Sequence, residues 1–217
     1  MTNYIGRQQD LKTKLNRHLT KITGQEKDYY QALSQADLAE LKNVLSDINN
    51  VFTLKLTLTA TEWLCQNFSV ASKLKKDILN RIDEIKPNTN GFDILINEPN
   101  LKIVAEVKCV FPSNNGSKYF AAQRNSILDD AYKLVNGKKQ LPDTNKYHKF
   151  LFIIYDGQRT DLALDTLLKP SKGTSDKEIR KNRHEIKVKI ELLKDKTISE
   201  LSTEKVYLKT LPITDYH

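Results

Sequence analysis

Apolar residues recur every three or four positions in two runs near the start of the chain, at 11–22 and 38–48, with Gly24 between them. This spacing predicts two amphipathic helices. Residues 51–58 alternate leucine with threonine and lysine, which indicates a short strand or an extended lead-in. The helical N-terminal part is therefore expected to end near residue 50.

A third helix is expected from Thr59 to about residue 85. Thr59 and Glu62 form the capping-box pattern that opens many helices, and apolar residues at helical spacing follow. Pro87 ends the pattern, because proline lacks the N–H that a helix interior needs. Glu62 thus has an ordinary interpretation as part of a helix cap.

Two short extended runs, 91–97 and 101–109, come next and meet at Pro99-Asn100. Proline presets the backbone of a tight turn, so the two runs are predicted to pair as a β-hairpin. A two-residue loop then places Asp93 directly across from Glu106. The hairpin therefore brings two carboxylates together.

The later pattern predicts one more helix and three strands. The helix is expected at 118–135, closed by Asn136-Gly137, and the strands at 149–156, 185–193 and 205–211. This order of elements favours an α/β fold with a mixed central β-sheet flanked by helices. A single domain is expected over 1–217, with a core at about 59–156, a helical part at 1–50 and a basic part at 157–217.

The composition narrows the class of protein. With 39% hydrophobic and 29% charged residues the chain is globular in character, and its longest apolar run, 150–155, is far shorter than the roughly 20 residues that cross a bilayer. The first residues lack a secretory signal, so we expect a cytoplasmic protein without a membrane segment. The two cysteines and four scattered histidines show no zinc-site spacing, which leaves oxygen atoms as ligands for any metal.

Alternation along the hairpin separates its side chains into two faces. One face is wholly apolar and is expected in the core: Phe92, Ile94, Ile96, Ile103, Ala105, Val107 and Cys109. The other face carries Asp93, Glu106 and Lys108 beside Leu95 and Val104. Opposed like charges repel, and Mg²⁺ would offset the repulsion because it favours carboxylate oxygens and keeps several waters. Lys108 can orient one of those waters, which predicts phosphodiester hydrolysis.

Asp93 followed by Glu106-Val107-Lys108 on the next strand resembles the motif of the PD-(D/E)XK nuclease superfamily. That superfamily includes most type II restriction endonucleases, archaeal junction resolvases and mismatch-nicking repair nucleases. The resemblance implies a mixed sheet with flanking helices and Mg²⁺-dependent cleavage of DNA. It also implies that Asp93, Glu106 and the backbone carbonyl of Val107 hold the metal, with Lys108 near the attacking water.

The resemblance covers roughly 59–156, about half of the chain. Glu62 matches an acidic residue that many members carry on the helix before the hairpin, and its alternative interpretation is a helix cap. Gln123 matches a glutamine that some members carry on the following helix, and its alternative is a solvated helix position. Phe92 stands where the family has proline. The Glu-x-Lys triplet occurs three times in the chain, but only the one at 106–108 lies on an expected strand. The alternative interpretation of the hairpin is a solvated face with ordinary surface charges.

A net charge of +8 suits a polyanionic partner such as double-stranded DNA. Basic residues are densest at 169–189, where eight lysines and arginines stand against three acidic residues. The expected DNA contacts are Asn114, Asn115 and Lys118 in the loop after the hairpin, Gln123 and Arg124 on the following helix, and Lys177, Arg180, Lys181 and Arg183 in the basic segment. Each of these residues is also consistent with an ordinary solvated surface.

The leading hypothesis from the sequence is a Mg²⁺-dependent DNA endonuclease, a type II restriction enzyme that acts as a homodimer on a short palindrome. The sequence contains no GxxxxGKS or GxxxxGKT loop, which argues against ATP-driven cleavage within this chain. Two alternatives stay open. One is a junction-resolving or repair nuclease of the same superfamily, and the other is a basic DNA-binding module without catalysis.

Overall fold

The computed structural model describes residues 3–85, 91–113, 116–138, 141, 143–169, 178–194 and 196–212. The chain divides into two compact units, unit 1 (Met1–Asn49) and unit 2 (Asn50–His217). Within the described ranges, no helix is both long enough and apolar enough to cross a membrane.

Unit 1 holds two helices and the start of a third: α1 (Tyr4–Thr23), α2 (Tyr29–Ala32) and α3 (Gln35–Asn67), which continues into unit 2. α1 ends at Gly24, which takes a left-handed conformation (φ 69°) and donates its N–H to the Thr20 carbonyl. The two predicted N-terminal helices are confirmed. None of the residues 3–49 is buried.

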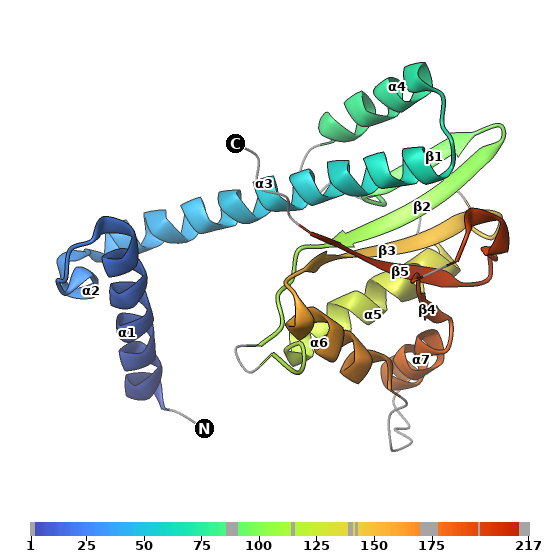
Figure 1. Cartoon of the computed structure of the whole chain (residues 1–217). Helices are drawn as coiled ribbons and strands as arrows, with labels where there is room; N and C mark the ends of the chain where they lie inside the picture. The colour runs from blue at the N-terminus through green and yellow to red at the C-terminus, as the bar shows by residue number, and fades with distance from the viewer. Residues whose placement is uncertain are drawn as a thin grey trace. The chain divides into compact units, whose positions relative to one another are not determined.

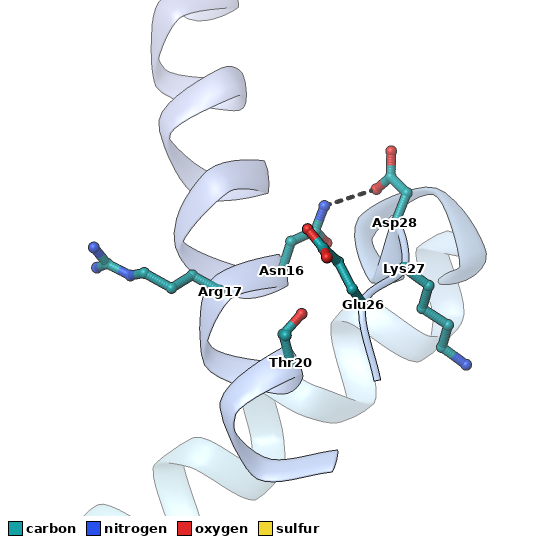
Figure 2. A pocket seen from close by; sticks show the side chains of 6 residues that line it. All are labelled: Asn16, Arg17, Thr20, Glu26, Lys27 and Asp28. Carbon is teal, nitrogen blue, oxygen red and sulfur yellow. Dashed lines mark hydrogen bonds between the residues drawn. The ribbon is translucent and has the colours of Figure 1, made fainter. Parts of the chain in front are cut away.

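Polar contacts join α1 to the segment that follows it. Asn16 donates an Nδ2 hydrogen to Asp28 Oδ1 (3.0 Å) and accepts the backbone N–H of Tyr30 (2.9 Å). Lys12 forms an ion pair with Asp28 at 2.5 Å. Figure 2 shows Asn16 reaching toward Asp28 at an open hollow of about 560 Å³, lined by Asn16, Arg17, Thr20, Glu26, Lys27 and Asp28. None of these lining residues belongs to the predicted site.

α3 is one continuous helix, so the strand predicted at 51–58 and the helix start predicted at Thr59 are wrong. Residues 35–67 contain no glycine or proline that would break a helix. Threonine hydroxyls in this stretch donate to the carbonyl four residues earlier, in the pairs Thr57 to Thr53, Thr59 to Lys55, and Thr61 to Thr57. The alternating threonines are thus accommodated by a helix, and Thr59 with Glu62 does not form a cap.

The helix predicted at 59–85 is in fact two helices, because α3 is followed after a short turn by α4 (Ser72–Asp83). Ser69 in the turn takes a left-handed conformation (φ 51°), and Val70 donates its N–H to the Cys65 carbonyl at 2.8 Å. This bond closes the C-terminus of α3. The turn allows α3 and α4 to bury side chains in the same core cluster.

Unit 2 is built on a five-stranded mixed sheet with the strand order β1-β2-β3-β5-β4. The strands are β1 (Ile94–Glu98), β2 (Leu101–Lys108), β3 (His148–Tyr155), β4 (Ile190–Leu192) and β5 (Val206–Pro212). β1 and β2 are antiparallel, and the other neighbouring pairs are parallel. The predicted α/β fold with a mixed sheet is confirmed. The predicted hairpin register is confirmed as well, since Ile94 pairs with Ala105 and Glu98 with Leu101.

Helices cover both faces of the sheet, with α4 and the unit 2 part of α3 on one side and α5 (Ala121–Asn136), α6 (Gln158–Leu168) and α7 (Glu178–Lys187) on the other (Figure 1). The first core cluster joins α3 and α4 to the hairpin residues Ile94, Ile96, Ile103, Ala105 and Val107. The second core cluster joins α5, α6 and α7 to Val104, Leu151 and Ile153. Phe92 was predicted on the first face but packs in the second cluster.

The strand predicted at 185–193 is wrong over most of its length, because α7 runs to Lys187 and β4 covers only 190–192. Ile186 on α7 and Ile190 on β4 are both buried in the second core cluster. Their spacing suits either a helix or a strand, so periodicity alone does not separate the two.

Candidate functional site

The hairpin brings Asp93 and Glu106 together. Asp93 lies one residue before β1, and its Oδ2 accepts the backbone N–H of Val107 on β2 at 2.7 Å. The charge of Asp93 also acts on Glu106 and raises the pKa of that carboxyl. The two carboxylates therefore meet across the hairpin as the register predicts.

Glu106 is the more deeply buried of the pair, with 4% of its surface exposed. Burial raises the pKa of its carboxyl to about 8, the charges of Asp93 and Asp130 add to that rise, and Lys138 opposes it. Oε1 of Glu106 lies 2.6 Å from Lys138 Nζ, yet it has no partner in hydrogen-bond geometry within the described part of the chain. Glu106 thus presents a buried oxygen that an ammonium group contacts but does not fully satisfy.

Lys108 lies two residues beyond Glu106 on β2 and reaches α5. Its Nζ forms an ion pair with Oδ2 of Asp130, and Lys133 Nζ binds the other oxygen, Oδ1, at 2.9 Å. The Asp130 side chain is buried, with 7% of its surface exposed. Asp130 and Lys133 were missed in the sequence, although acidic residues in the helix that follows the hairpin were an available signal.

Lys138 also lies in the cluster and was missed. It follows Gly137, the residue that ends α5, and its ammonium contacts the Glu106 carboxylate. The same ammonium donates to the Gly91 carbonyl and lies 4.8 Å from the centroid of the Phe92 ring. No sequence pattern indicates this contact, because it joins a loop residue to a strand and to the segment before the hairpin. We call Asp93, Glu106, Lys108, Asp130, Lys133 and Lys138 the acid-lysine cluster.

Glu62 does not join the acid-lysine cluster. It is exposed on α3, whose buried side chains belong to the first core cluster, whereas α5 packs in the second. Burial raises the pKa of the Cys65 thiol in that first cluster, and the charge of Glu62 adds to the rise. The structure therefore places Glu62 close to Cys65 on α3, and its role as a site carboxylate stays a prediction.

The residues expected to contact DNA near the start of α5 differ in what they bind. Gln123 Oε1 accepts the backbone N–H of Phe120 at 2.9 Å, and its Nε2 donates to the Phe111 carbonyl at 3.2 Å. These bonds fix the start of α5, so Gln123 has a structural function that the sequence did not suggest. Lys118 and Arg124 are exposed, as a DNA contact requires.

Arg183 ties α7 to α5. Its Nε and one terminal nitrogen donate to the two carboxylate oxygens of Asp129 at 2.8 and 2.9 Å, a bidentate pair. Arg183 is therefore engaged by Asp129, and its expected contact with DNA stays a prediction. Other expected DNA contacts lie outside the described residues or side chains: Asn114, Asn115, Lys177, Arg180 and Lys181.

A metal ion in the acid-lysine cluster would be held by oxygens of Asp93 and Glu106. Among the described residues, no group of three or more Asp, Glu, His or Cys side chains is placed to hold a metal ion. Mg²⁺ commonly takes only one or two protein carboxylates and keeps several waters. The incompletely satisfied Oε1 of Glu106 fits such an ion if the ammonium of Lys138 moves aside.

Comparison with known proteins gives no assignment. No protein-family model matches the chain, and no curated protein or solved structure matches it. The likeness to the PD-(D/E)XK superfamily therefore consists of the hairpin residues alone. A functional interpretation has to come from the chemistry of the acid-lysine cluster.

Proposed function

We propose that the protein is a Mg²⁺-dependent DNA endonuclease. The observation that carries the proposal is Asp93 set across the hairpin from buried Glu106, with Lys108 two residues further along β2. Two carboxylates and an ammonium on one face of a hairpin are groups that metal-assisted phosphodiester hydrolysis uses.

In this proposal Asp93, Glu106 and the Val107 carbonyl hold the metal. When bound, Mg²⁺ supplies an activated water and positive charge for the phosphate oxygens. Lys108 orients the attacking water and binds a non-bridging phosphate oxygen. Asp130 is a positioning residue, because its buried carboxylate holds the Lys108 ammonium beside the hairpin.

Double-stranded DNA is the proposed substrate. The net charge of +8 favours a polyanion. The bidentate pair between Arg183 and Asp129 holds α7 against α5, the same helix that carries Asp130. The described basic residues of α7 are thereby held on the side of the sheet where Lys108 lies. We propose further that the enzyme is a cytoplasmic type II restriction endonuclease that cuts a short site as a homodimer.

One observation favours a second candidate, a DNA-binding module without catalysis. Glu106 is paired with Lys138, and Asp130 is paired with both Lys108 and Lys133. A buried network in which carboxylates already have ammonium partners is also what a purely structural cluster looks like. The two candidates differ in whether the cluster accepts a metal ion and cuts.

A plasmid assay tests the proposal. Purified protein is incubated with supercoiled plasmid, linear duplex and four-way junction DNA, each with Mg²⁺ or with EDTA. Discrete Mg²⁺-dependent fragments support the restriction enzyme, and preferential cutting of the junction supports a resolvase. DNA binding in a gel-shift assay without cutting of any substrate supports the binding module. Glu106→Gln should abolish cutting, whereas Glu84→Gln, an exposed carboxylate beyond α4, should not.

A further inference from the structure

α3 carries an apolar stripe in unit 1 with the spacing of a coiled-coil seam. Leu38, Leu41, Leu45 and Ile48 follow one another in alternating steps of three and four residues. Residues with this spacing form one narrow face that packs against another helix. Leu38 and Leu41 are half-buried, whereas Leu45 is 56% exposed, Ile48 43% and the adjacent Val44 47%. We call Leu38, Leu41, Leu45 and Ile48 the α3 seam.

Unit 1 contains no core of its own within residues 3–49, since none of them is buried. α1 likewise exposes large apolar side chains, with Tyr4 at 78%, Ile5 at 71%, Leu11 at 51% and Ile22 at 65%. Most helical stability in proteins comes from packing an apolar face rather than from helix propensity. Unit 1 therefore needs a partner that covers these faces.

The exposed apolar area has the size of an interface. Each large apolar side chain that is exposed to this extent can contribute on the order of 100 Å² of apolar surface to an interface. The seven exposed ones on α1 and on the start of α3 together offer roughly 700 Å², close to the about 800 Å² that each partner contributes to a stable interface. The partner should thus cover unit 1 broadly.

Charge identifies the partner. α1 carries five basic residues and one acidic residue, whereas 35–49 of α3 carries three acidic residues and one basic residue. The acidic residues of 35–49 lie beside the α3 seam rather than on it, and they would repel DNA. A second unit 1 offers an apolar seam of the same spacing together with a basic helix. In a two-fold arrangement, any contact of the acidic side of α3 with the partner's basic α1 is made twice.

We propose that the α3 seam is a homodimer interface, in which unit 1 of one copy packs against unit 1 of a second copy as a helical bundle. The inference does not depend on the chemistry of the acid-lysine cluster, because every residue of that cluster lies in unit 2. Absence of DNA cleavage in the plasmid assay would therefore leave the dimer proposal unaffected.

The test uses the full chain and light scattering coupled to size exclusion between 1 and 100 µM. The wild type should have twice the mass of the chain. Leu45→Asp combined with Ile48→Asp should weaken dimerisation by at least about 100-fold. Leu162→Asp is the matched control, because Leu162 on α6 in unit 2 has an exposed fraction (47%) between those of Ile48 and Leu45. This variant should remain dimeric.

Hydrogen exchange separates loss of the interface from loss of the fold. In the wild type, protection of 4–23 and 35–48 should increase with protein concentration, because dimerisation stabilises unit 1. The double variant should lose that protection and keep the protection of β3. A monomeric wild type at 100 µM, a double variant that stays dimeric, or unit 1 protection that is independent of concentration would each overturn the proposal.

Discussion

Replacing Glu106 by glutamine should make the protein less sensitive to high pH. Burial, together with the charge of Asp93, raises the pKa of Glu106 from 4.5 to about 8. The folded protein therefore binds this proton more tightly than the unfolded chain does. The stability that the neutral carboxyl contributes is fully present below pH 4.5 and is lost as the pH rises to about 8.

The size of the loss follows from the pKa values. One pKa unit corresponds to about 1.4 kcal/mol. Between pH 5 and pH 9, ionisation of Glu106 should lower the free energy of unfolding by about 4 kcal/mol. Glutamine has the shape of the protonated glutamate but does not titrate, so Glu106→Gln should lack this component. The attraction between Lys138 and the ionised Glu106 is already included in the pKa of about 8, so it needs no separate correction.

Urea unfolding in EDTA at pH 5, 7 and 9 measures the difference. The wild type should lose about 4 kcal/mol more than Glu106→Gln between pH 5 and pH 9. Glu84→Gln, at an exposed position, should follow the wild type. Equal losses in the wild type and in Glu106→Gln would refute the reasoning, because Glu106 would then titrate alike in the folded and unfolded chains.

Three further predictions concern the metal, the ammonium and the basic helix. A metal binds the ionised form of Glu106, so the apparent affinity for Ca²⁺ should rise about tenfold per pH unit from pH 6 to pH 8. Calorimetry without DNA measures this affinity, and a flat pH profile would contradict a metal site at Glu106. Lys108→Ala should slow DNA cleavage at least about 100-fold with DNA affinity nearly unchanged, whereas the control Lys102→Ala should cut normally. Near-normal cutting by Lys108→Ala would exclude a role for Lys108 in orienting the attacking water. Arg183→Ala should cost about 1 kcal/mol and increase hydrogen exchange in α7, because the pair with Asp129 is lost; unchanged exchange would mean that other contacts hold α7.

The hairpin shows what local sequence specifies well. Pro99-Asn100 sets a two-residue turn, and the turn length fixes which residues face each other. The opposition of Asp93 and Glu106 follows from the turn and from the alternation of side chains along the strands. No contact from elsewhere in the chain was needed to predict it.

Two strand predictions failed where alternation was the only guide. At 51–58, threonine hydroxyls that donate to carbonyls four residues earlier make the stretch compatible with α3. At 185–193, Ile186 and Ile190 are buried in one cluster although one lies on a helix and the other on a strand. In both places burial against the sheet, rather than local propensity, selected the structure.

The pattern of residues along the chain was enough to predict the α/β fold class, the hairpin with its register, and the carboxylate pair with Lys108 on the same face. The partners of these groups depend on how distant elements pack. Asp130 reaches Lys108 from α5, and Lys138 reaches Glu106 from the loop beyond that helix. The physical reason is that turn geometry and alternation act between neighbours in the chain, whereas ion pairs form between side chains that only the packing of distant elements brings together.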